Sequence, residues 1–304
     1  MVRRIDENTV TEAVIEQMAG TTDPRFKEIM TSLVRHLHEF AREVDLTAEE
    51  WLTAIRFLTA VGQKCTEHRQ EFVLLSDTLG FSSLINTLHD KRTADEATKS
   101  SLLGPFYRQD APVMKLGDSI IFDSKGPEVV YYGQVTNAAG QGIANALVQV
   151  WEPDETGNYD LQKLDPSVMD LRGRFRTDAQ GRYYFRGICP TGYRIPMDGP
   201  VGDMIRAQRR HGYRPAHIHF IVGAPGYREL VTALYVAGDE HIDSDTVFGV
   251  SDSLVISVNP KDPASPIPNL PTVHYDFRLA AAAKNAAMSG RVGADPSQIL
   301  QKAH

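Results

Sequence analysis

Two histidines with one residue between them, His217 and His219, are the first candidates for metal chemistry in this 304-residue chain. They lie in the run Arg-Pro-Ala-His-Ile-His-Phe, which begins at Arg214. The pattern around them predicts a strand, and on a strand residues two apart point to the same face. Both imidazoles could therefore bind one metal ion, although two half-buried polar side chains on a strand would give the same pattern.

His36 and His38 have the same spacing, but the sequence around them predicts a helix. Residues i and i+2 of a helix do not face each other. We therefore interpret this second pair as structural.

The residues alone leave the remaining ligands open. Zinc usually recruits cysteine or further histidine, and Cys189 is a poor candidate on its own. A ferrous site with two histidines and one carboxylate stays open, but the nearest downstream acid, Glu229, lies beyond a proline–glycine turn. Tyr159 and Tyr193 follow polar or glycine-rich segments. A cation would lower the pKa of either phenol, and phenolate suits ferric iron. Each tyrosine on its own is more simply explained by packing.

Composition limits the functional classes. The net charge of -7 argues against nucleic acid, which requires a basic surface. We interpret the cluster of Arg206, Arg209 and Arg210 as a solvated helix end. Two cysteines make no disulfide framework, and no apolar segment approaches the roughly 20 residues that span a bilayer. We expect a reduced, cytoplasmic protein that is not a membrane protein.

The first hundred residues predict helices. Thr9 with Glu12 and Thr47 with Glu50 have the spacing of capping boxes, and Asp23-Pro24 is typical of a helix start. Apolar residues then recur at steps of three and four, which indicates one amphipathic helix. They are Phe26, Ile29, Leu33, Leu37, Phe40 and Val44.

From Gly104-Pro105 to about Leu279 the apolar residues recur at every second position. Expected strands are 175–177, 183–185, 217–222, 230–236, 254–258 and 273–277, with a hairpin loop at Asp178–Gly181. Helices followed by strands exclude a doubly wound α/β fold. We predict a mostly β protein with an antiparallel β-sandwich core. The expected domains are a helical one (1–102), a catalytic sandwich (103–279) and a tail (280–304).

Several segments together resemble the intradiol ring-cleavage dioxygenases. The resemblance runs from the N-terminal helices to about residue 278. The segments are Ala146–Pro153, Gly157–Tyr159, Phe175–Asp178, Gly181–Arg186, Pro190–Tyr193, Arg214–His219 and Ala224–Tyr227.

This resemblance implies one ferric ion per chain. Tyr159 and His217 correspond to equatorial ligands, and Tyr193 and His219 to axial ones. Tyr193 would leave the metal when a substrate diol binds. Arg214 matches the active-site arginine that stabilises negative charge on the ring.

Further segments resemble the hydroxyquinol 1,2-dioxygenase branch, which implies cleavage of 1,2,4-trihydroxybenzene by dioxygen to 3-hydroxy-cis,cis-muconate or maleylacetate. Ala233 stands where the catechol and protocatechuate branches have a glutamine. Besides Arg214, the implied pocket residues are Leu74, Asp77, Gly104, Pro105, Phe106, Ile195, Pro196 and Val247.

Catechol or chlorocatechol is the alternative substrate, and a non-catalytic β-sandwich binding module is the alternative from another class. The resemblance also implies a homodimer through the helical domain, with a tunnel there that can hold phospholipid.

Overall fold

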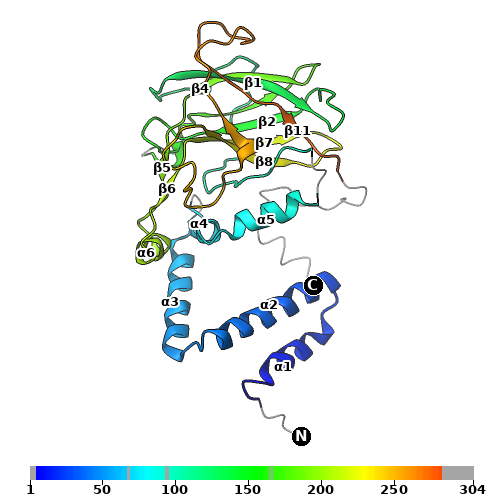
Figure 1. Ribbon diagram of the computed structural model, residues 1–304, viewed down its shortest axis with the longest axis vertical. Coiled ribbons are helices and arrows are strands. Elements are labelled where there is room, and N and C mark those ends of the chain that lie inside the picture. Colours follow the sequence, from blue (N-terminus) through cyan, green and yellow to red (C-terminus); the bar gives the residue numbers. More distant parts are fainter. Residues whose placement is uncertain (1–4, 67–68, 93–95, 164, 166, 283–304) are drawn as a thin grey trace. The chain divides into compact units, whose positions relative to one another are not determined.

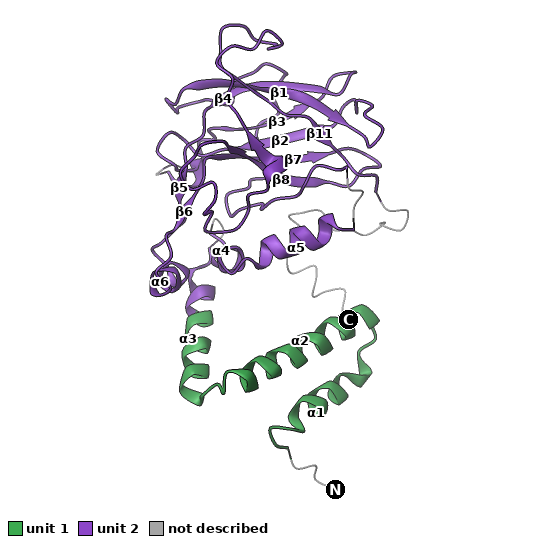
Figure 2. Ribbon diagram, viewed as in Figure 1, with its two compact units in different colours: residues 1–59, 290–304 green, residues 60–289 purple. Residues whose placement is uncertain are grey.

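Figure 1 shows the computed structural model, which describes residues 5–66, 69–92, 96–163, 165 and 167–282. The chain forms two compact units, residues 1–59 with 290–304 and residues 60–289 (Figure 2). The expected tail lies largely outside the described residues. Within them, no helix is both long and apolar enough to cross a membrane.

The first unit is helical. Its elements are α1 (Val10–Gln17), a 3-10 turn (Met18–Gly20), α2 (Pro24–Glu43) and the start of α3 (Ala48–Lys64). The Asp23 side chain caps α2, and Thr47 and Glu50 form the expected reciprocal pair. The expected box of Thr9 with Glu12 is wrong. The Thr9 hydroxyl instead donates to Asp6, 2.8 Å away, because the chain turns three residues earlier.

His36 and His38 contact different partners, as expected for a helical pair. His36 Nδ1 lies 3.4 Å from a Glu39 carboxylate oxygen, and His38 Nδ1 lies 3.0 Å from the Thr11 hydroxyl.

The second unit contains α4 (Glu71–Thr78), α5 (Phe81–Asp90) and α6 (Pro200–Ala207) beside the strands. Gly80 separates α4 from α5 with a φ of 72°, a conformation that glycine adopts without strain. The unit boundary at residue 59 places α4 and α5 with the strands, whereas the expected helical domain extends to residue 102. That domain boundary stays a prediction.

Two sheets form the body of the second unit, which confirms a mostly β fold with N-terminal helices. One has the order β3-β2-β7-β8-β9; in the other, β1 pairs with β4, β10 and β11. Most pairings are antiparallel, but β10 and β11 join β1 in parallel, as β9 joins β8. The strands are β1 (Glu128–Thr136), β2 (Leu147–Trp151), β3 (Arg172–Arg176), β4 (Arg182–Ile188), β5 (Tyr193–Arg194), β6 (Tyr213–Arg214), β7 (His217–Gly223), β8 (Leu230–Val236), β9 (Val255–Ile256), β10 (Thr272–His274) and β11 (Phe277–Arg278).

The expected hairpin at Asp178–Gly181 is wrong. β3 pairs with β2 and β4 pairs with β1, so this loop crosses from one sheet to the other. The reason is packing: Phe175 and Phe185 face each other across the sandwich, with ring centroids 5.0 Å apart. Strands whose apolar side chains meet face to face cannot also be neighbours in one sheet.

Candidate metal and substrate site

His217 and His219 are the first and third residues of β7, the central strand of its sheet, and both are buried. Their Nε2 atoms lie 3.1 Å apart. His217 Nδ1 lies 2.7 Å from the Pro215 carbonyl, which can only accept, so Nδ1 carries the proton. Burial lowers the pKa of both histidines, and the Arg214 charge lowers it further. Both are therefore neutral, the form that binds metal.

Tyr159 and Tyr193 lie beside these histidines. The two phenol rings meet edge to face at 5.6 Å, and the Tyr193 ring lies 5.3 Å from that of His217. Gly157 permits this approach, since a Cβ there would lie 2.7 Å from the Tyr193 Cβ. The structure thus brings together all four residues that the sequence suggested as ligands.

The Tyr159 hydroxyl is fully buried and has no hydrogen-bond partner of normal geometry within the described residues. Burial raises its pKa well above the ordinary value, and Tyr193 raises it further. A buried polar atom of this kind normally has a partner. A cation beside the four side chains would serve as that partner and would lower the pKa, so these residues fit a metal.

A carboxylate does not complete the site. Within the described ranges, no three histidine, cysteine, aspartate or glutamate side chains are grouped to hold a metal ion. The oxygen donors beside His217 and His219 are phenols.

Arg214, on β6, points at the histidines. Its Nη1 lies 3.0 Å from His217 Nε2, and Asp245 accepts from its Nε at 3.2 Å. Burial works against the charge, but Asp245, Tyr193 and Tyr235 outweigh it and raise the pKa of Arg214. Asp245 and Tyr235 were not expected at this site; the only signal for Asp245 in the sequence is its position two residues before Val247.

A second buried ion pair supports Tyr159. Arg172 Nε donates to Asp160 at 2.6 Å, and its Nη1 donates to the Phe106 carbonyl at 3.2 Å. The Phe106 ring stacks on Tyr159 with centroids 4.5 Å apart. The pair therefore fixes the turn that follows Tyr159 and the ring that packs on it. Neither charge was recognised from the sequence.

Only some of the suggested pocket residues line one cavity. Leu74, Pro105, Phe106 and Pro196 line a cavity of about 450 Å³. Ile195, Val247, Asp77 and Gly104 are not among its lining residues. Ile195 and Val247 are buried, and a Cβ on Gly104 would lie 3.4 Å from the His219 ring.

Asp77 is 5% exposed on α4. Burial raises the pKa of its carboxyl, while a hydrogen bond from Ser82 and the Arg214 charge partly offset this. The carboxylate therefore lies within the electrostatic reach of Arg214.

Arg210 is not part of a solvated helix end, so that interpretation is wrong for this residue. It donates to the Thr78 carbonyl at 2.8 Å and to the Thr246 carbonyl at 2.7 Å. It thereby holds the end of α4, beside Asp77, against the segment that carries Val247.

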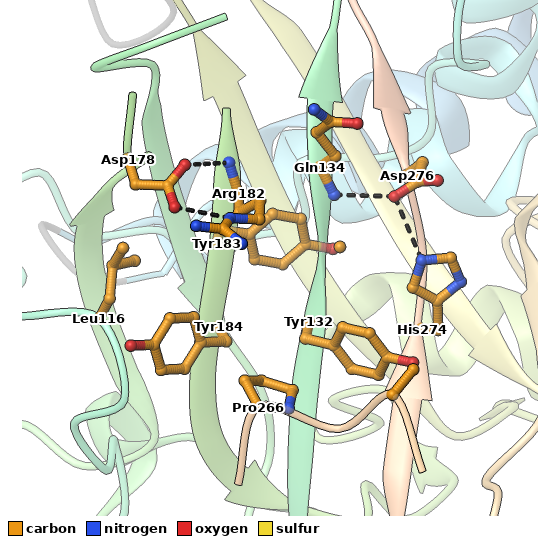
Figure 3. A pocket seen from close by; sticks show the side chains of 12 residues that line it. Leu116, Tyr132, Gln134, Asp178, Arg182, Tyr183, Tyr184, Pro266, His274 and Asp276 are labelled. Carbon is orange, nitrogen blue, oxygen red and sulfur yellow. Dashed lines mark hydrogen bonds and ion pairs between the residues drawn. The ribbon is translucent and has the colours of Figure 1, made fainter. Parts of the chain in front are cut away.

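A larger cavity of about 680 Å³ lies elsewhere, over β1 and β4 (Figure 3). Arg182 donates to Asp178 there, and Asp276 lies 3.3 Å from His274. Its charged groups pair with one another, and it contains none of the suggested site residues.

Comparison with known proteins identifies the relatives. Residues 102–281 match the family described as Dioxygenase, and residues 23–97 match the catechol dioxygenase N terminus. The 6-chlorohydroxyquinol 1,2-dioxygenase of Cupriavidus pinatubonensis is 45% identical over 84% of this chain and 92% of its own. The hydroxyquinol 1,2-dioxygenase of a Rhizobium species is 45% identical over 82% of this chain and 84% of its own.

A solved structure agrees with these sequences. The hydroxyquinol 1,2-dioxygenase of Pseudomonas putida superposes with a TM-score of 0.81 at 40% identity, covering 91% of this chain and 99% of that one. These matches cover most of the chain and are all to enzymes, so they exclude the alternative of a non-catalytic β-sandwich binding module. The chain belongs to the intradiol ring-cleavage dioxygenases, a family of non-haem iron enzymes that act on aromatic diols with dioxygen.

Proposed function

We propose that this chain is a hydroxyquinol 1,2-dioxygenase that binds one ferric ion through Tyr159, Tyr193, His217 and His219. The main support for this metal site is that two neutral imidazoles lie beside two buried phenols. The bound iron supplies Lewis acidity that draws electron density from the diol ring. The compartment is proposed to be the cytoplasm.

Other parts of the reaction are assigned to individual side chains. Tyr193, one of the four residues that would hold the iron, would accept a proton that a substrate hydroxyl loses. Arg214 stabilises the negative charge that develops on the ring, and its pairing with Asp245 fixes the direction of its guanidinium. Phe106 and Leu74, which line the 450 Å³ cavity, keep water away from the ring.

The substrate assignment rests on Asp77 and on the relatives. A third ring hydroxyl entering an apolar pocket needs a partner, and a carboxylate is a strong acceptor. A site that pairs this hydroxyl also disfavours a diol without it, because its polar group stays unpaired. The Cupriavidus and Rhizobium relatives described above are named as 6-chlorohydroxyquinol and hydroxyquinol 1,2-dioxygenases.

The first prediction concerns the metal. Tyr159→Phe and His217→Ala should lose most of the bound iron and the red tyrosinate-to-iron absorption, because each removes a ligand. Visible spectra and metal analysis measure this, with Tyr184→Phe in the distant cavity as the control. Active, colourless wild-type protein with stoichiometric zinc would refute the proposal.

The second prediction concerns Arg214. Removing one preorganised donor typically lowers turnover by about 10²–10³, and Arg214→Ala should do so while iron stays bound. The change also removes the cation beside buried Asp245, which keeps only the backbone N–H donors of Val247 and Gly249. Removing one partner of a buried ion pair typically destabilises by roughly 3–5 kcal/mol. The double variant Arg214→Ala with Asp245→Asn should restore much of the stability but not the turnover. Unchanged turnover in either variant would contradict the role.

The third prediction concerns the substrate. Oxygen uptake should show a higher kcat/KM for hydroxyquinol than for catechol, with a muconate-type diacid identified by mass. Asp77→Ala should lower the preference by about 1–3 kcal/mol, the usual effect of one unpaired buried polar group. A preference for catechol would support a catechol 1,2-dioxygenase instead, and a yellow semialdehyde would refute cleavage between the hydroxyls.

We also propose that the chain forms a homodimer through its helical unit, with phospholipid held at the interface. Five apolar residues of α2, from Phe26 to Phe40, and its C-cap residue Val44 are each between 47% and 58% exposed. A continuous apolar stripe of this kind is typical of a protein interface or a lipid contact.

The fourth prediction tests this stripe. Light scattering should give twice the 33.7 kDa chain mass, and Leu33→Glu with Leu37→Glu should shift it toward the monomer, because two charges would be buried. Glu28→Lys on the other side of α2 is the control. A wild-type monomer would contradict the dimer, and lipid extraction with mass spectrometry tests the phospholipid.

A further inference from the structure

Glu152 is a buried acid next to the site that takes no part in the proposed metal or substrate binding. It follows Trp151 at the end of β2 and is 2% exposed. Its side chain reaches across the sandwich to the other sheet. One carboxyl oxygen accepts the backbone N–H of Ile188 at 3.0 Å, and the other lies 3.1 Å from the Tyr131 hydroxyl.

The protons in this cluster can be counted. The Tyr131 hydroxyl also lies 2.7 Å from the Ile188 carbonyl, which can only accept. A phenol has one proton, and the shorter contact indicates that Tyr131 donates it to Ile188. The remaining contact between Glu152 and the Tyr131 oxygen then needs a proton on Glu152.

We propose that Glu152 is a neutral carboxylic acid that joins the two sheets beside the metal site and positions His219 and Tyr193. Its position at the end of β2 links it to His219. The neighbouring Trp151 pairs with His219 in the sheet and stacks on its ring, with centroids 4.9 Å apart and an interplanar angle of 3°.

The second link runs through Ile188, the last residue of β4. Glu152 binds its N–H and Tyr131 binds its carbonyl, so both backbone groups are held. The chain continues from Ile188 through a short loop to Tyr193, the start of β5. One side chain thus sets the positions from which two proposed ligands extend.

Gly187 leaves room for this carboxyl, because a Cβ at that position would lie 2.5 Å from the Glu152 Oε1. The groups that face Glu152 act in both directions. The contacts with the Ile188 N–H and the Tyr131 hydroxyl lower its pKa, whereas the charge of Asp170 before β3 raises it, and Cys189 after β4 also lies near. No cation is among the electrostatic neighbours of Glu152 in the described chain. Burial raises the pKa of Glu152 to about 8.

The experiment compares wild type with Glu152→Gln and Glu152→Ala in the full chain, both iron-loaded and iron-stripped. Glutamine keeps the acceptor for Ile188 and places an N–H donor toward Tyr131, so it reproduces the neutral acid. Glu155→Gln, an exposed acid three residues away, is the matched control. The readouts are iron retention, the tyrosinate-to-iron band, the infrared carboxyl band and the unfolding temperature of the iron-stripped protein.

Glu152→Gln should retain iron and keep the wild-type absorption band. Glu152→Ala should hold iron about 10–100-fold more weakly, the usual effect of losing a residue that orients ligands, and should shift the band. Wild type should show a protonated-carboxyl infrared band that Glu152→Gln lacks. Because the folded pKa lies above the ordinary 4.5, wild type should lose stability relative to Glu152→Gln as the pH rises from 4.5 through about 8.

Two results would overturn the inference. Equal loss of iron in Glu152→Gln and Glu152→Ala would mean that the carboxylate charge is needed. A wild-type tyrosinate-to-iron band and full iron retention in Glu152→Ala would mean that Glu152 does not position the ligands. The positioning role rests on the proposed ligands, so wild-type protein that binds no iron would instead refute the proposed function. The infrared band decides the protonation in either case.

Discussion

The site depends on one constraint: buried lone pairs must find a partner. The Nε2 atoms of His217 and His219 face each other at 3.1 Å beside the Tyr159 hydroxyl, in an interior that excludes water. The Pro215 carbonyl takes the only proton of neutral His217, which directs its Nε2 lone pair inward. Arg214 Nη1 lies 3.0 Å from this atom and can donate to it, but the buried Tyr159 hydroxyl has no partner of normal geometry among the described residues. A buried polar atom without a partner is unfavourable for folding, and a metal ion beside the four side chains would be such a partner. The rest of the second unit can be understood as the structure that holds them in place.

Buried charge pairs hold this arrangement from two sides. Arg214 is fixed by Asp245, and Arg172 is fixed by Asp160. A buried pair adds little net stability, but breaking one is strongly destabilising, so each pair makes its local geometry hard to change. The pairs have different tasks. Arg214 directs positive charge at His217, whereas Arg172 holds the backbone around Tyr159 and Phe106.

The sandwich explains why ligands distant in sequence can meet. Trp151 and His219 are paired neighbours on β2 and β7, and Tyr193 follows β4, which belongs to the other sheet. The ends of both sheets therefore contribute to one place. If Glu152 is the neutral link proposed above, the same acid sets the distance between the sheets and the separation of two ligands.

The sequence by itself determined the two histidines on one strand face, the capping of the long N-terminal helix by Asp23 and the change from helices to strands. These features follow from local periodicity and hydrogen bonding, which short segments carry. The four suggested ligands came from motif resemblance, and only the tertiary structure brought them within contact. The predicted hairpin at Asp178–Gly181 was wrong because the residues of a turn do not reveal which sheet each flanking strand joins. Asp245, Arg172 and Glu152 could not be recognised either, since an acid or a base acquires such a role only from the buried partner that the fold brings to it.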